Sequence, residues 1–155
     1  MRLTDLLSPL HLTASHDTEI SGISCDSRKV VPGQLFAALP GVKEDGAAYV
    51  QAAIEKGAVA ILSSKPVEAP VPVIVVENAR EALAHIATRF YAPQPQHVAA
   101  VTGTNGKTST AHFAMQLWQG AGLTSATIGT VGIFGSNISE PGSLTTPDPI
   151  ELHSH

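Results

Sequence analysis

A run of small and polar residues has the types and spacing of a phosphate-binding loop: Thr102-Gly103-Thr104-Asn105-Gly106-Lys107-Thr108-Ser109. Glycines let the backbone curl until successive amides point at a phosphate, and the N-terminus of a following helix adds partial positive charge. The Lys107 ammonium can neutralise the β and γ phosphates of a nucleotide, and the Thr108 hydroxyl can ligate a bridging Mg²⁺. The sequence therefore predicts a nucleotide site with Thr108 as its metal ligand.

This loop differs from the standard phosphate-loop pattern, which would place a glycine where Val101 stands. The first glycine is Gly103, so the loop is shorter. A chance glycine-rich turn is the alternative interpretation. The position of Gly-Lys-Thr between an expected strand and an expected helix favours phosphate binding.

The segments around this loop predict a βαβ unit. Residues 97–102 form a short apolar run, residues 107–119 have helical character, and residues 124–128 form a second run. Such a unit has parallel strands and a right-handed crossover. We expect the large apolar side chains of the helix to pack in a core: Phe113, Leu117 and Trp118. Two strands and one helix are too few to bury both faces of a parallel sheet, so we expect the chain to end inside a domain.

The preceding segment predicts a small domain of its own. Short apolar runs bounded by turn residues predict strands at 20–24, 34–39, 58–63 and 71–77, with a helix at 45–56. Asn78 has the pattern of a helix N-cap, with Glu81 as its capping-box partner. The fold class is therefore α/β. We expect a small mixed α/β domain at 1–92, a proline linker at 92–96, and the incomplete start of a parallel-sheet P-loop ATPase domain at 97–155.

Composition narrows the classes of partner. The 155 residues carry a formal net charge of −4 and no basic run, which argues against a nucleic-acid-binding face. Cys25 is the only cysteine, the N-terminus lacks the pattern of a signal peptide, and the apolar runs are too short to span a bilayer. We expect a cytoplasmic protein with no membrane partner. We also expect a monomer, with association through the unpaired edge of the unfinished sheet as the alternative.

Three strings together resemble the Mur ligases. Thr102–Ser109 has the form of their ATP loop, which folylpolyglutamate synthetases share. Cys25-Asp26-Ser27-Arg28, followed by residues 31–36, resembles the N-terminal signature of the Mur ligases, and residues 41–58 resemble the segment that follows it. Folylpolyglutamate synthetases have no counterpart to Asp-Ser-Arg. Thr145-Thr146-Pro147-Asp148 resembles a loop of the member that adds the third amino acid of the peptidoglycan precursor.

The resemblance implies an ATP-dependent, ADP-forming ligase of peptidoglycan synthesis. Members of this type join diaminopimelate, or alternatively lysine, to UDP-N-acetylmuramoyl-L-alanyl-D-glutamate through an acyl phosphate. Matching residues imply an ATP and Mg²⁺ site at Gly103, Thr104, Asn105, Gly106, Lys107, Thr108 and Ser109. They imply substrate contacts at Ser27, Arg28, Asp45, Thr145, Thr146 and Asp148. Val42 departs from members that carry histidine there.

The resemblance also implies that no catalytic residue is present, because the family's second Mg²⁺ carboxylate, its carbamylated lysine and its C-terminal domain would follow His155. We therefore expect this chain alone to be inactive. Other interpretations remain: a folylpolyglutamate synthetase-like ligase, or a stand-alone module that binds a UDP-sugar or nucleotide. Asp26-Ser27-Arg28 fits a solvated turn too, and Asp148 fits the cap of a helix through Ile150 and Leu152. His153 and His155 fit solvated residues better than metal ligands.

Overall fold

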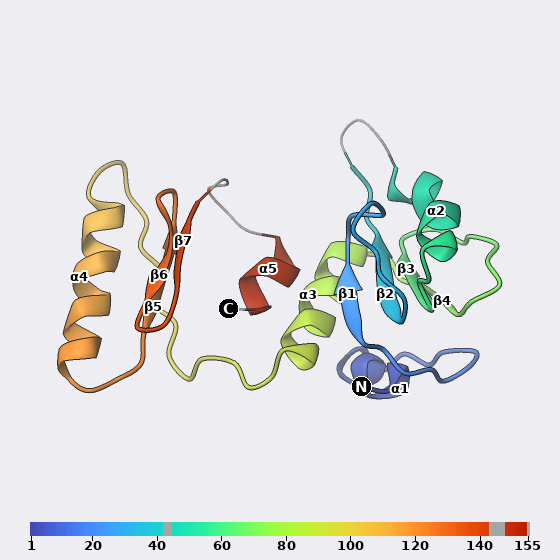
Figure 1. The fold of residues 1–155 in the computed structure, drawn as a ribbon, viewed down its shortest axis with the longest axis horizontal. Helices are drawn as coiled ribbons and strands as arrows, with labels where there is room; N and C mark the ends of the chain where they lie inside the picture. The colour runs from blue at the N-terminus through green and yellow to red at the C-terminus, as the bar shows by residue number, and fades with distance from the viewer. Residues whose placement is uncertain (42–44, 143–147, 155) are drawn as a thin grey trace. The chain divides into compact units, whose positions relative to one another are not determined.

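The computed structural model describes residues 1–41, 45–142 and 148–154, and it forms two compact units. Unit 1 consists of Met1–Gln94 and Pro149–His155, and unit 2 of Pro95–Asp148. The chain therefore leaves unit 1 after Gln94 and re-enters it at Pro149, where the last helix begins (Figure 1).

Unit 1 is built on a parallel four-stranded sheet with the strand order β1-β2-β3-β4. Its strands are β1 (Gly22–Ser24), β2 (Gln34–Ala38), β3 (Ala60–Ser63) and β4 (Val73–Val75). Its helices are α1 (Leu3–Leu7), η1 (Ser8–Leu10), η2 (Gly46–Tyr49), α2 (Val50–Glu55), α3 (Ala79–Phe90) and α5 (Pro149–Ser154). The predicted α/β fold is confirmed in this unit, whereas the parallel sheet itself had been predicted for residues 97–155.

Both faces of this sheet are covered, as expected for parallel strands that are apolar at successive positions. In β2, Leu35 and Ala37 lie in one buried cluster with residues of α1 and α3. The alternate residues Phe36 and Ala38 lie in a second cluster with Val50 and other residues of the α2 side. The period of two along the strand therefore divides β2 between two cores, and it fixes the register of the central strands.

The predicted cap of α3 is confirmed. The Asn78 side-chain oxygen accepts a hydrogen bond from the Glu81 backbone N–H at 3.3 Å. The Glu81 carboxylate accepts from the Asn78 side-chain amide, also at 3.3 Å, where a standard capping box uses the backbone amide of the cap. Leu83 and Ile86 on the inner face of the helix are fully buried. The cap thus sets the start of a helix whose apolar face contacts the sheet.

Helix α1 is an element that the sequence patterns did not predict. Leu3, Leu6 and Leu7 are all fully buried although the helix has only five residues. Its entry is held by backbone hydrogen bonds to the segment before β1, where Ile20 N–H donates to Met1 C=O at 2.8 Å. A helix this short gains little from propensity, so its stability comes from tertiary packing.

The described residues of unit 2 form one helix and one antiparallel sheet. The helix is α4 (Lys107–Gly120), and the strands are β5 (Ala126–Gly129), β6 (Gly132–Gly135) and β7 (Ser139–Pro141), in the order β5-β6-β7. Gly132 has φ +130°, and a Cβ there would collide with the Glu140 carbonyl oxygen. Glycine is therefore required where the β5–β6 turn enters the sheet.

Three expectations for this region are wrong. Residues 97–102 form no strand in the structure, and β5 pairs antiparallel with β6 instead of parallel to an upstream strand. Phe113 and Leu117 are 63% and 74% exposed, so they do not pack in a core. The physical reason is common to all three: no second strand or apolar layer among the described residues of unit 2 is placed to pair with residues 97–102 or cover this helix face.

The described part of the chain contains no helix with the length and apolar character needed to span a membrane.

Candidate functional site

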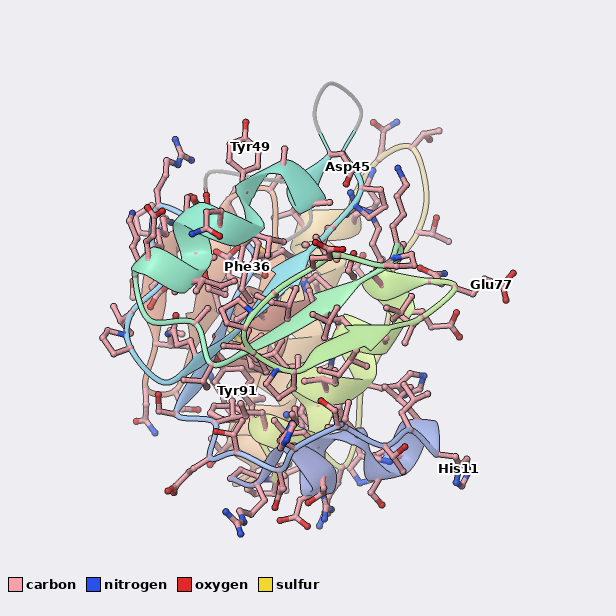
Figure 2. The ribbon with its side chains drawn as sticks, turned by 90° about the vertical axis from the view of Figure 1, so that its right-hand side faces the viewer. His11, Phe36, Asp45, Tyr49, Glu77 and Tyr91 are labelled. Carbon is pink, nitrogen blue, oxygen red and sulfur yellow. The ribbon has the colours of Figure 1, made fainter. Side chains whose placement is uncertain are left out.

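A pocket of about 500 Å³ lies in unit 1 beside the turn that follows β1. It is lined by backbone and side chains from that turn, from β2 and from η2: Cys25, Asp26, Ser27, Arg28, Phe36, Leu39, Gly46 and Tyr49. Figure 2 shows Tyr49 on the η2–α2 segment, which passes over the strand that carries Phe36. Two residues predicted to contact substrate, Ser27 and Arg28, therefore share one pocket.

The turn in this pocket is organised by Asp26. Its carboxylate Oδ1 accepts hydrogen bonds from the backbone N–H and from Nε–H of Arg28, both at 2.9 Å. Oδ2 accepts from Arg28 Nη2 at 2.9 Å, so the ion pair is bidentate. The Lys29 N–H donates to the Asp26 carbonyl at 2.9 Å and closes a turn. An aspartate that bonds the amide two residues on is typical of such turns.

These bonds shift the ionisation of both partners. Hydrogen bonds from the Arg28 side chain, and then from its backbone amide, lower the pKa of Asp26 to about 2. The same side-chain bond raises the pKa of Arg28. The Arg28 side chain stays 84% exposed. The pocket therefore presents a fixed guanidinium that is still accessible to an anion.

Asp45 lies next to this pocket, but its carboxylate is already engaged. Oδ1 accepts from the Ala47 N–H at 3.1 Å and caps η2, and Oδ2 lies 2.7 Å from Lys65 Nζ. The hydrogen bond from Lys65 is the main reason that the pKa of Asp45 is lowered. Figure 2 shows Asp45 at the start of the η2 segment. In this structure Asp45 shapes the rim, and its contact with substrate stays a prediction.

Sequence reasoning did not assign Phe36, Leu39, Gly46 and Tyr49 to the site. Gly46 is needed because a Cβ there would lie 2.6 Å from the Leu39 carbonyl oxygen. The Gly46 N–H donates to that same oxygen at 3.0 Å, so η2 begins against the end of β2. The available signal was Gly46-Ala47-Ala48-Tyr49, in which small residues let a backbone approach closely and one aromatic residue follows.

The predicted phosphate loop lies in unit 2, between residue 102 and α4. Gly103 and Gly106 have positive φ values of +145° and +77°, which curl the chain before the helix. The Lys107 ammonium folds back onto this loop, 2.6 Å from the Gly103 carbonyl and 3.5 Å from that of Thr104. A Cβ on Gly106 would meet no atom within 4 Å, so the glycine is needed there for its positive φ and not for lack of space.

The start of α4 fits a phosphate. Its N-cap is Gly106, which supplies no side-chain acceptor, so the first amides of the helix have no capping partner. These amides belong to Lys107, Thr108 and Ser109, all exposed. Exposed residues at a helix N-terminus and the Lys107 ammonium can together hold an anionic phosphate group, with the Thr108 hydroxyl beside it for Mg²⁺. The described residues contain no cluster of three or more His, Cys, Asp or Glu that could hold a metal ion by itself.

The remaining predicted residues are placed only in part. Thr145 and Thr146 lie outside the described residues. Asp148 is exposed and directly precedes α5, which spans the expected positions Ile150 and Leu152. The Asp148 contact with a ligand therefore stays a prediction.

Comparison with known sequences decides the family. The profile described as "Mur ligase family, catalytic domain" matches residues 19–91, and the profile "Mur ligase middle domain" matches residues 101–155. Together they span most of the chain. The chain belongs to the Mur ligase family. The first match contains the pocket in unit 1, and the second contains the phosphate loop.

Curated Mur ligases of one kind are similar to almost the whole chain. It is 49% identical over 158 aligned residues to the UDP-N-acetylmuramoyl-L-alanyl-D-glutamate--2,6-diaminopimelate ligase of Mesorhizobium japonicum, with 99% of this chain and 33% of that protein covered. It is 51% identical over 148 aligned residues to the ligase of the same name from Agrobacterium fabrum, with 96% and 30% covered. The chain thus spans about a third of the length of these relatives.

Solved Mur ligase structures share the fold. A structure of UDP-N-acetylmuramoyl-L-alanyl-D-glutamate--2,6-diaminopimelate ligase superposes with a TM-score of 0.77 at 24% identity, over 96% of this chain and 32% of that one. The MurF ligase of Thermotoga maritima in complex with ADP superposes with a TM-score of 0.61 at 23% identity, over 88% and 29%. These two solved structures therefore share the fold of this chain.

Proposed function

We propose that this chain is part of an ATP-dependent ligase that adds diaminopimelate to UDP-N-acetylmuramoyl-L-alanyl-D-glutamate in peptidoglycan synthesis. The main support is that 49% and 51% of the aligned residues are identical to those of two curated ligases of that name, over nearly all of this chain. Lysine is the alternative amino acid. The reaction would join substrate carboxylate and amine through an acyl phosphate.

Within this scheme, the pocket beside β1 holds the uridine-diphosphate end of the substrate. Its chemistry fits that role because Arg28 offers a planar fork for phosphate oxygens, and Phe36 and Tyr49 offer aromatic surface for a base. The Ser27 hydroxyl is half-buried beside Arg28 and has no hydrogen-bond partner among the described residues. Asp45 acts on this site by capping η2 and so shaping the rim.

The phosphate loop at Gly103–Ser109 holds the ATP phosphates, and Thr108 ligates Mg²⁺. The Lys107 ammonium already bonds the Gly103 carbonyl, and its other N–H donors can contact a phosphate held in the loop. Thr145, Thr146 and Asp148 contact the muramoyl-peptide end. When bound, ATP would supply the activating phosphoryl group and Mg²⁺ would neutralise the charge of its phosphates; the residues of this chain would bind and orient them.

The experiment is a calorimetric titration of the chain with UDP-N-acetylmuramoyl-L-alanyl-D-glutamate. Saturable binding that Arg28→Ala weakens by tenfold or more, roughly the value of one charge-assisted bidentate contact, supports the proposal. Lys29→Ala is the matched control, because Lys29 is an exposed cation in the same turn but does not line the pocket. Binding that Arg28→Ala leaves unchanged would remove the pocket from the proposal.

The nucleotide half is tested separately with ATP and Mg²⁺ in the same chain. Lys107→Ala should weaken binding, and Lys65→Ala, which removes a cation from unit 1, should not. Equal binding by wild-type and Lys107→Ala would contradict the assignment of the loop.

A further inference from the structure

The Arg28 guanidinium has two edges that can each make paired hydrogen bonds to an oxyanion. The side edge, Nε and Nη2, is bound to the two oxygens of Asp26 at 2.9 Å each. The end edge, Nη1 with the second N–H of Nη2, has no acceptor among the described residues. One edge is thus bound internally, and the other remains for a ligand.

The backbone beneath this pair is held from three sides. Asp26 Oδ1 also accepts from the Arg28 N–H, and the buried Ser24 hydroxyl donates to the Asp26 carbonyl at 3.0 Å. Lys56 Nζ, on the residue that ends α2, donates to the Arg28 carbonyl at 2.7 Å. The backbone of the turn is therefore held at Asp26 by Ser24 and at Arg28 by Lys56. With the backbone held, the two bonds from Asp26 fix the orientation of the Arg28 guanidinium.

We propose that Asp26 is a positioning residue that holds Arg28 with its end edge ready for a diphosphate in the pocket. This inference rests on the proposed function of that pocket and assigns a role to a residue that would not itself touch the ligand. An arginine on the surface loses considerable rotamer freedom when it binds, and a side chain held beforehand loses less.

The opposite role for Asp26 would be competition, in which the carboxylate occupies the arginine that the ligand needs. Three features of the geometry favour positioning. Asp26 uses only one edge of Arg28, so no displacement is needed. The carboxylate is tied to the backbone amide of the same arginine. Lys29 and Lys56 also border the turn, so its net charge stays positive despite Asp26.

The test is a titration of the chain with UDP, comparing wild-type with Asp26→Asn and Asp26→Glu. The asparagine keeps the size and one acceptor but cannot accept from both nitrogens of the fork. We expect about three- to tenfold weaker UDP binding for Asp26→Asn and partial recovery for Asp26→Glu. Asp17→Asn is the matched control, since Asp17 also pairs with an arginine, Arg2 at 3.0 Å, away from the pocket.

A spectroscopic readout separates positioning from a general loss of structure. In ¹⁵N-labelled protein without ligand, the Arg28 Nε–H should give a resolved signal protected from exchange, which Asp26→Asn removes while backbone signals of β1 and β2 persist. Unchanged or tighter UDP binding by Asp26→Asn would overturn the positioning role and leave the pocket's function standing. No UDP binding by wild-type would instead overturn the proposed function, and the positioning role with it.

Discussion

His153 Nδ1 lies 2.7 Å from the side-chain oxygen of Gln94, so the last described helix is bonded to the residue at which the chain leaves unit 1. The other ring nitrogen lies 3.1 Å from the Thr88 hydroxyl, which donates its own proton to the Ala84 carbonyl at 2.8 Å. Gln94 is oriented by donating to the Tyr91 carbonyl. Both ring nitrogens of His153 therefore have a hydrogen-bond partner in unit 1, which corrects its interpretation as a solvated residue.

His153→Ala should release α5 from α3. Loss of two side-chain hydrogen bonds should lower the free energy of opening of α5 by about 1–2 kcal/mol, seen as faster amide exchange in that helix while β2 and β3 keep their protection. His85→Ala is the control, because His85 is an exposed histidine of α3. Exchange in α5 that is equal in all three proteins would show that the histidine does not hold the helix.

The Asp26 carboxyl should titrate with a pKa of about 2. Its pKa is depressed in the folded chain, so the pair stabilises the fold above the usual value of 3.8 and loses that effect as the pH falls through about 2. Because the Arg28 side chain is exposed to solvent, we expect the pair to contribute little to the free energy of unfolding. The pKa of Asp26, followed through its carboxyl ¹³C shift by NMR, should move back toward 3.8 in Arg28→Ala. An unchanged titration in that variant would refute the pairing.

Gly46→Ala should destabilise unit 1 by about 1–3 kcal/mol, because the new methyl group would press against the Leu39 backbone at the pocket wall. Gly120→Ala is the matched control: it lies in α4 with nothing within 4 Å of a Cβ, so it should be neutral or stabilising. Urea unfolding of both variants measures the difference. Equal midpoints would mean that η2 can move away from β2 to accommodate the methyl group without lowering the free energy of unfolding.

Leucines in the two units should respond differently to truncation. Leu83→Ala removes a fully buried side chain and should cost about 2–5 kcal/mol. Leu117→Ala, on the exposed face of α4, should change stability by less than about 0.5 kcal/mol. Thermal unfolding of the two variants distinguishes these cases, and a large loss for Leu117→Ala would indicate that this face is covered in solution.

The sequence predicted those elements whose signals are local. Asn78 and Glu81 identified the start of α3, and the short apolar run at residues 34–39 identified the strand β2. Helix α1 escaped because five residues are too few to display a period, and its burial depends on the distant segment at Ile20. Residues 97–102 have the composition of a strand, but a strand also requires a neighbour to pair with, and composition does not report one.

The candidate site was predictable to a similar extent. Ser27 and Arg28 were found from their motif, and the structure places them in one pocket. The walls, Leu39 and Tyr49, come from separate segments that only the fold brings together. The engagement of Asp45 with Lys65 likewise joins residues twenty positions apart across the end of the sheet, a distance over which no short motif extends.

Unit 1 is discontinuous, and this has a consequence for the order in which the protein is made. Synthesis proceeds from the N-terminus, so the sheet and α3 emerge well before α5, with all of Pro95–Asp148 between them. During that interval Thr88 of α3 and Gln94 after it lack the contacts that His153 of α5 makes with them. Unit 1 of a nascent chain can therefore be largely folded on the ribosome yet acquire α5 only after the whole phosphate-loop unit has been translated.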